Sequence, residues 1–344
     1  MPQYLVDLLI IIAKIGIVHM VLLTAVAYTV YAERRVSAFI QNRIGPNRVG
    51  PAGLLQPLVD IIKLLLKEDI VPTNANRFMH SLAPAISVIV ALSTFAVIPF
   101  GNTITIGDTV IKLQIADVNI GILYFLAMTS LGVYGVTISG WSSNNKYSLL
   151  GGLRSAAQMI SYELSMGLAV IAIILMNGTL QLDKIVASQA GWKWNIILQP
   201  VGFIIFLVSA FAETNRTPFD LPEAEQELVG GYHTEYSSMK FALFFLAEYM
   251  NVIVSSAMIT TLYLGGYHFP YLESFGLPPF WVSIIQVLVF CLKVLFMVLF
   301  FIWVRWTVPR FRYDQLMNLG WKVMLPIGIL NLIVTALVIL LMKS

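Results

Sequence analysis

Two glutamates, Glu163 and Glu248, lie within long apolar stretches of the sequence. A charged side chain at the centre of a bilayer costs about 2.5–3.5 kcal/mol on insertion scales, so each should face a bundle interior, a partner or water. Because desolvation raises the proton affinity of a carboxyl, such a group can change protonation state when a neighbouring charge changes. Both residues are therefore candidates for a proton relay. Lys14 and Lys293 also lie in apolar stretches, where a structural ion pair or snorkelling to the interface is an equally good explanation.

The segment 212–236 is strongly acidic. It contains one arginine, Arg216, against six acids: Glu213, Asp220, Glu223, Glu225, Glu227 and Glu235. Asp220 and Glu223 have the spacing of a capping box, and acids in a first helical turn complement the helix dipole. That explanation does not cover Glu227, which would repel Glu223 on the same helical face. A proton held by one of them near neutral pH would ease the repulsion, whereas a solvated acidic loop is the alternative.

An apolar framework must position these residues. The 344-residue chain is 58% apolar and 11% charged, with a mean hydropathy of +0.82, whereas a soluble domain is about 25% charged. A helix needs about 20 apolar residues to cross a hydrocarbon core of roughly 30 Å. Hydropathy windows predict eight spans, at 8–31, 82–100, 118–140, 158–177, 195–212, 241–264, 280–304 and 322–342. We expect an all-α integral membrane protein with one domain over residues 1–344.

The basic residues predict the orientation. The connections 33–80, 141–157, 213–240 and 305–322 hold 15 lysines and arginines, and the opposite side holds four. The positive-inside rule therefore places these connections in the cytoplasm and both termini outside. A net charge of +3 does not indicate a nucleic-acid partner. The N-terminus lacks the basic region of a signal peptide, so we expect a retained first helix.

The first cytoplasmic connection contains an amphipathic helix, at about 54–68. Its polar residues recur at helical spacing: Gln56, Asp60, Lys63 and Lys67. The helix is too short to span a bilayer and should lie along the membrane surface or under the bundle. A Gly- and Pro-rich stretch precedes it and carries Arg43 and Arg48.

Two basic segments complete this face: Glu33-Arg34-Arg35 and the stretch 305–317 with Arg305, Arg310 and Arg312. Alone, they are ordinary positive-inside anchors. Because arginine and aromatic side chains are favoured at interfaces, the arginines at 43, 48, 305, 310 and 312 are also candidates for docking an extramembrane partner.

Cysteine and histidine counts argue against a metal or redox centre in this chain. Its one cysteine, Cys291, cannot supply the four thiolates of an iron–sulfur cluster. The four histidines lie in separate segments, which disfavours a bis-histidine haem. If the protein works with electrons, another subunit carries them.

Four motifs, in the same order, are similar to a known family: Glu33-Arg34-Arg35, the 41–51 stretch with Arg43-Ile44-Gly45-Pro46-Asn47, the run from Ala212 to Leu221, and the run from Trp303 to Arg310. Together with the length, the eight spans and the amphipathic helix, they resemble one membrane subunit of respiratory complex I, the NADH:quinone oxidoreductase. This is the H subunit of the bacterial complex, which is numbered 1 in mitochondria. The likeness covers essentially the whole chain.

The resemblance implies a subunit of the bacterial inner membrane that lies against the peripheral arm and forms a quinone-access chamber. Iron–sulfur clusters and flavin would belong to partner subunits, and quinone would be the substrate. The chamber residues implied are Glu33, Arg34, Arg35, Asp60 and Lys63. The proton relay implied is Glu163, Glu213, Glu223, Glu225, Glu227 and Glu248, leading toward antiporter-like subunits. Because 121–140 contains no acid, a relay passing it must use water or acids on other helices.

Three alternatives stay open at this point. The first is a subunit of a related quinone dehydrogenase that uses ferredoxin or another donor. The second is a stand-alone cation transporter, which should show inverted repeats and broken helices that this sequence lacks. The third is a passive membrane anchor, which would not need Glu163 and Glu248 in costly positions.

Overall fold

The apolar stretches fold as helices, because backbone N–H and C=O groups find no water in a bilayer and must pair internally. The computed structural model describes residues 3–106, 109–221, 228–270, 272, 276 and 278–343. Among them, seven helical segments are long and apolar enough to cross a membrane. They are built on α1 (Gln3–Ile40), α3 (Arg77–Thr94), α4 (Gly121–Ser142), α5 (Lys146–Asn177), α10 (Ser238–Tyr263), α11 (Pro279–Thr307) and α13 (Leu325–Lys343). The predicted all-α integral membrane protein is confirmed.

The span expected at 195–212 is shorter than the others. It consists of α7 (Asn195–Leu198) and α8 (Pro200–Glu213), which begins at a proline. Proline fits the first turn of a helix because its missing N–H would be unpaired there anyway. The 14 residues of α8 rise only about 21 Å at 1.5 Å per residue. This helix packs against α5 and α10.

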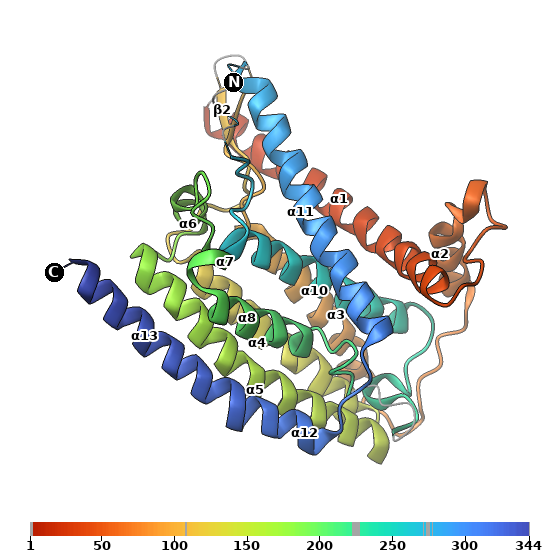
Figure 1. Ribbon diagram of the computed structural model, residues 1–344. Coiled ribbons are helices and arrows are strands. Elements are labelled where there is room, and N and C mark those ends of the chain that lie inside the picture. Colours follow the sequence, from red (N-terminus) through yellow and green to blue (C-terminus); the bar gives the residue numbers. More distant parts are fainter. Residues whose placement is uncertain are drawn as a thin grey trace.

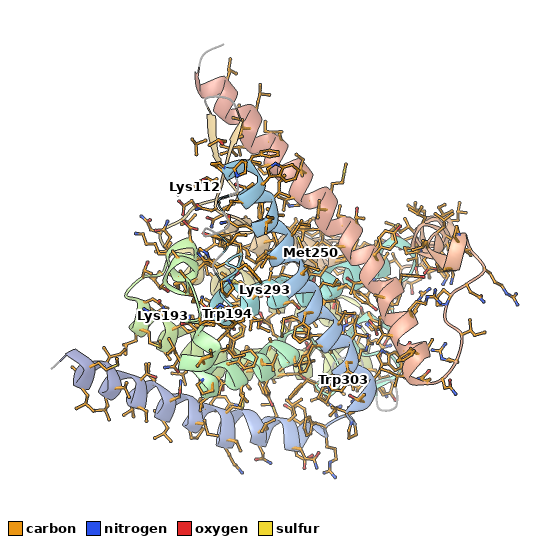
Figure 2. All side chains as sticks on the ribbon, turned by 45° about the horizontal axis from the view of Figure 1, so that its top comes forward. Lys112, Lys193, Trp194, Met250, Lys293 and Trp303 are labelled. Atoms are coloured by element: carbon orange, nitrogen blue, oxygen red, sulfur yellow. The ribbon has the colours of Figure 1, made fainter. Side chains whose placement is uncertain are left out.

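The helices form a broad row rather than a ring. Figure 1 shows α4, α5 and α13 side by side along one flank, and α1 on the other flank beside α11. Between them, α10 contacts α3, α8 and α11. The last span reaches α13 through α12 (Tyr313–Asn318) and a π-helical segment at Leu319–Met324. The centre of the row is the most buried part, and Met250 of α10, labelled in Figure 2, is fully enclosed.

Short elements cover the two ends of the bundle. One end, here called the α2 end, carries α2 (Gln56–Leu66) and the turns η1 (Pro51–Gly53) and η3 (Gly231–His233). The other carries η2 (Phe95–Val97), α6 (Leu182–Ser188) and an antiparallel hairpin of β1 (Thr103–Ile106) and β2 (Thr109–Lys112). At the hairpin, Lys112 Nζ lies 2.5 Å from Asp117 Oδ2. This hydrogen bond holds the pKa of Asp117 below its ordinary value.

Backbone carbonyls hold the two lysines of the apolar stretches. Lys14 Nζ donates to the carbonyl of Gln114 at 3.0 Å. Lys293 Nζ donates to three carbonyls at 2.7–3.0 Å, those of Leu264, Gly266 and His268. It also lies 4.7 Å from the centre of the Trp194 ring, its neighbour in Figure 2. Because Lys293 binds the chain just after α10, it closes the end of that helix and has a structural role.

Candidate functional site

Four charged side chains from four segments meet inside the α2 end of the bundle. Glu33 comes from α1, Glu248 from α10, Arg305 from α11, and Arg216 from the turn after α8. Arg305 Nη1 lies 2.5 Å from Glu33 Oε1, and Arg216 Nε lies 2.7 Å from Glu248 Oε1. Arg216 Nη1 is also 3.6 Å from Glu33 Oε2. We call these four residues the buried network.

Burial and charge balance make the buried network interdependent. The side chains of Glu33, Glu248 and Arg216 are at most 9% exposed. Tyr249 adds its hydroxyl, which donates to Glu33 Oε2 at 2.8 Å, and its ring, whose centre is 4.0 Å from the Arg216 guanidinium carbon. Among the described residues, the network sets two acids against two bases. Removing one partner of such a buried pair typically costs about 3–5 kcal/mol, because a charge is left uncompensated.

The turn after α8 aims Arg216 inward. Asn215 adopts a left-handed conformation with φ of 51°, which asparagine tolerates better than most residues. The amide of Gln158, fully buried on α5, donates to the carbonyl of Ala212 at 2.8 Å and to that of Phe219 at 2.7 Å. Both ends of the turn are therefore fixed to α5, and Arg216 between them cannot swing out to solvent without breaking these bonds.

A second pair of carboxyls lies on the α5 side of this turn. Glu163 of α5 accepts a hydrogen bond from the hydroxyl of Ser130 on α4. Glu213, at the end of α8, lies beside Thr129 of α4 and close enough to Glu163 for the two carboxyls to interact electrostatically. Its Oε2 atom is buried and has no hydrogen-bond partner among the described residues. Two adjacent hydroxyl side chains of α4 thus lie beside two neighbouring acids.

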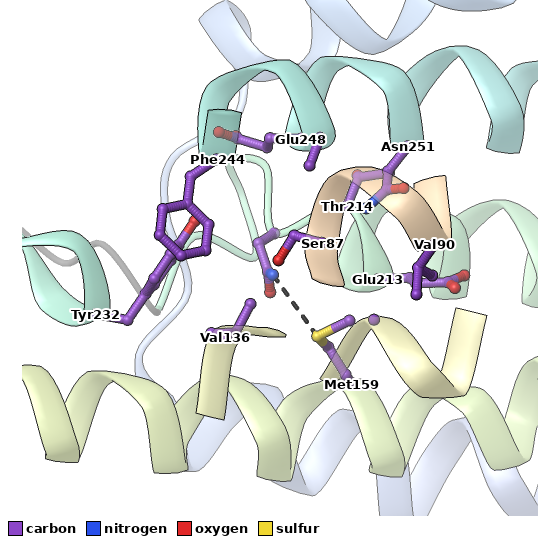
Figure 3. A pocket seen from close by; sticks show the side chains of 13 residues that line it. Ser87, Val90, Val136, Met159, Glu213, Thr214, Tyr232, Phe244, Glu248 and Asn251 are labelled. Atoms are coloured by element: carbon purple, nitrogen blue, oxygen red, sulfur yellow. Dashed lines mark hydrogen bonds between the residues drawn. The ribbon is translucent and has the colours of Figure 1, made fainter. Parts of the chain in front are cut away.

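A cavity connects this pair to the buried network. It is lined by Glu213 and Glu248 together with the polar side chains of Ser87, Thr214 and Asn251. Figure 3 shows the two glutamates on different helices at opposite sides of the cavity, and the hydrogen bond that Asn215 donates to the Met159 sulfur. Its volume of about 30 Å³ has room for roughly two water molecules, since one needs about 10–15 Å³ and several polar partners. The cavity is therefore large enough and polar enough to hold water.

On its other side, Glu163 reaches the outer surface of the bundle. It lines two open grooves, one of about 580 Å³ between α4 and α5 and one of about 600 Å³ between α5 and α13. The remaining lining is almost entirely apolar, with Leu153, Ile160 and Leu164 among the exposed side chains. The Glu163 carboxyl therefore lies at the base of a largely apolar groove on the outer surface of the bundle.

Two of the residues implied for the chamber, Arg34 and Asp60, meet where α1 faces α2. Arg34 Nη1 lies 2.7 Å from Asp60 Oδ2, and Gln56 also donates to Asp60, at 2.9 Å. Arg35 Nε donates to the hydroxyl of Tyr31 at 3.0 Å. Lys63, on α2, is exposed.

The arginines expected to dock a partner are divided between the interior and the surface. Arg43, Arg48 and Arg312 are exposed, and Arg310 is partly so. Arg305 instead points into the buried network, where Glu33 binds it.

The sequence analysis missed Arg216, Tyr249, Thr129 and Ser130. The signal for Arg216 was present, because it is the one arginine among the six acids of 212–236. The relay candidates Glu223, Glu225 and Glu227 lie outside the described residues.

Comparison with known proteins identifies the family. The family model described as NADH dehydrogenase matches residues 13–336. The H 1 subunit of NADH-quinone oxidoreductase from Cytophaga hutchinsonii is 52% identical over 339 residues, 98% of each chain. The chain belongs to the H-subunit family of NADH-quinone oxidoreductase. Subunit 8 of the Rhodothermus marinus enzyme is 55% identical over 93% of this chain and 94% of its own. The H 1 subunit of Geobacter metallireducens is 52% identical over 99% of this chain and 100% of its own.

Membership in this family makes the chain a membrane subunit of an oxidoreductase complex, with other subunits of that complex as its partners. In the part of the chain that the structure describes, no group of three or more His, Cys, Asp or Glu is placed to hold a metal ion.

Proposed function

We propose that the junction of α1 and α2 forms part of the quinone chamber, and that the buried network passes the charge change of quinone reduction to a proton path ending at Glu163. Reduction of a quinone to a quinol takes up two electrons and two protons. An iron–sulfur cluster of a neighbouring subunit delivers the electrons, after a flavin in the peripheral arm has accepted them from NADH. This chain contributes the chamber wall and the proton path.

The observation that carries the proposal is that Glu33 and Glu248 share Arg216. Glu33 has two further partners, Arg305 and Tyr249, so it can release Arg216 without being left unpaired. When Glu33 gains a proton, Arg216 is free to bind Glu248 more strongly, and when Glu33 loses it the hold on Glu248 weakens. The protonation state of one carboxyl is therefore linked to that of the other.

The chamber and the buried network are adjacent on the same helix. Glu33 faces the network, and its neighbour Arg34 pairs with Asp60 of α2. A charge that appears beside this pair changes the electrostatic potential at Glu33, because the partly buried α1–α2 junction screens charge less than bulk water does. The chamber residues proposed here are Glu33, Arg34, Arg35, Asp60 and Lys63.

The proton path runs from Glu248 through the cavity to Glu213 and then to Glu163. Thr129 and Ser130 support it where α4 has no acid. From Glu163 the proton leaves by the grooves beside α5, against which we place the small and antiporter-like membrane subunits. The acids Glu223, Glu225 and Glu227 belong to the same proposal on sequence grounds alone.

The proposed location is the inner membrane of a bacterial cell, with the α2 end in the cytoplasm. The relatives named above are bacterial, and the excess of lysine and arginine in the connections at this end supports the orientation.

Substitution of Glu163 tests the proton path. Gln keeps the shape and much of the hydrogen bonding but cannot titrate, whereas Asp titrates but is shorter. In assembled enzyme reconstituted into vesicles, Glu163→Gln should lower proton pumping by about 100-fold or more, as for loss of a proton-transfer group, and Glu163→Asp should retain more of it. The measurements are turnover and the ratio of protons pumped to electrons transferred.

A carboxyl that only accepts the Ser130 hydrogen bond predicts the reverse order, since Gln would replace it at least as well as Asp. Ser130→Ala removes that hydrogen bond but leaves Glu163 titratable, so it should pump more than Glu163→Gln does. Parent-level pumping by Glu163→Gln would exclude this glutamate as an obligatory carrier.

A further inference from the structure

Two adjacent serines at the start of α10 bind the end of α2. The last carbonyls of a helix have no partner within it, so other groups must satisfy them. The hydroxyl of Ser238 shares its one proton between the carbonyl of Leu64 at 3.0 Å and that of Lys67 at 2.9 Å. Ser238 is only 6% exposed, so this contact is shielded from water.

Ser237 binds the chain just beyond α2. Its oxygen accepts the N–H of Ile70 at 2.8 Å, and its hydroxyl faces the carbonyls of Glu68 at 3.2 Å and Ile70 at 3.4 Å. Nearby on α10, Lys240 Nζ lies 2.9 Å from Asp69 Oδ2. The end of α2 is therefore bonded to the start of α10 through three consecutive contacts of Ser237, Ser238 and Lys240.

The backbone at Ser238 is strained. Its φ of 52° lies in the left-handed region, which costs a residue with a Cβ about 1–2 kcal/mol. Glycine would adopt this conformation without that cost but has no hydroxyl. Strain of this kind persists only where surrounding contacts over-determine the conformation. The two bonds from the Ser238 hydroxyl are such contacts.

The opposite side of α2 is bound to α1. Arg34 pairs with Asp60, and the hydroxyl of Tyr31 donates to the carbonyl of Ala52, just before α2, at 2.6 Å. As a result α2 bridges the helix that carries Glu33 and the helix that carries Glu248. From Ser238 to Glu248 is ten residues of α10, or about 15 Å of continuous helix.

We infer that Ser237 and Ser238 form a serine clamp of positioning residues, which transmits displacement of α2 to the segment of α10 that carries Glu248. The inference rests on the proposed function, because it takes α2 as a wall of the chamber. Movement of α2 during quinone turnover shifts α10 along or about its axis and changes the 2.7 Å contact between Glu248 and Arg216. This gives the buried network a mechanical input beside the electrostatic one.

The test compares Ser237→Ala/Ser238→Ala with Ser237→Thr in the assembled complex in vesicles. The double variant should lower the ratio of protons pumped to electrons transferred by about five-fold or more, the low end of ordinary coupling free energies, while quinone reduction continues. Ser237→Thr keeps a hydroxyl and should retain the parental ratio. Ser93→Ala is the matched control, because that hydroxyl bonds within its own helix, to the carbonyl of Ile89.

A purely structural role for the serines predicts something else, namely that less complex assembles while each assembled complex pumps at the parental ratio. That result overturns the inference. If the double variant does not assemble, Ser237→Ala and Ser238→Ala are measured singly. The same fall in the pumping ratio is then expected of each.

Glu248→Gln, measured in the same vesicles, separates the two proposals. If it lowers the ratio and the serine variants do not, the clamp is wrong and the relay stands. If Glu248→Gln itself pumps at the parental ratio, the relay is wrong.

Discussion

Arg216 is the residue on which the site depends most. It is 4% exposed, contacts both acids of the buried network and lies over the ring of Tyr249. Its planar guanidinium can face two carboxylates at once, which the point charge of a lysine does less well. Glu33 and Glu248 are therefore linked through one side chain rather than by direct contact.

We expect Arg216→Met to leave two buried carboxylates facing a single base, Arg305, and to destabilise the subunit by about 3–5 kcal/mol. The amount of assembled complex in membranes should fall accordingly. The charge-balanced variant Arg216→Met/Glu248→Gln removes one charge of each sign and should recover assembly without recovering proton pumping. Native electrophoresis and pumping assays measure the two effects.

Lys193→Met is the surface control, since the Lys193 side chain is exposed and is not among the residues proposed for the site or for docking. It should assemble and pump as the parent does. If Arg216→Met also assembled and pumped as the parent does, the buried network would contribute neither to the stability of the subunit nor to the coupling.

At the scale of the elements, close helix contacts position the hydroxyls of α4 against the acids. A Cβ on Gly140 would lie 2.5 Å from the carbonyl oxygen of Ser148 on α5, and one on Gly135 would collide with the hydroxyl of Ser87 on α3. Small residues allow such approach between helices in a membrane. The contacts hold α4 where Ser130 meets Glu163.

Gly140→Ala should therefore force α4 and α5 apart at a cost of about 1–3 kcal/mol, as for other overpacked sites. The thermal stability of the assembled complex should fall. Gly132→Ala on the same helix is the matched control, because the nearest atom to its Cβ would be Val90 Cγ1 at an ordinary 3.8 Å. Equal stability of the two variants would show that the α4–α5 contact is not tight.

The sequence predicts where the helices lie better than it predicts which side chains pair between them. Hydropathy locates the long helices, since about 20 apolar residues have few other ways to satisfy their backbone in a membrane. Hydropathy overestimates the length of α8, because the proline at position 200 fixes where that helix begins. The acids Glu163 and Glu248 stand out locally because each is costly where it lies.

At the scale of the whole molecule, local sequence patterns could not predict which side chains of the site pair with one another. Glu33 and Arg305 are 272 residues apart and meet only because α1 and α11 are neighbours. For that reason the sequence predicts Arg305 to be a surface anchor, whereas in the structure it pairs with Glu33. The orientation of the bundle stays a prediction from its basic connections.

Four titratable side chains follow one another in space from the α2 end of the bundle to the outer grooves beside α5. Glu33, Glu248, Glu213 and Glu163 come from four helices, joined by Arg216, a cavity and the hydroxyls of α4. The central claim is that quinone reduction at one end changes carboxyl protonation at the other.

Infrared difference spectroscopy of the assembled complex, recorded on quinone reduction, tests this claim most directly. The carbonyl stretch of a protonated carboxyl is resolved from that of a carboxylate, so a glutamate that changes state contributes a band. A carboxyl band present in the parent should be lost in Glu163→Gln and be displaced but retained in Glu163→Asp. Identical carboxyl bands in the parent and in Glu163→Gln would contradict it.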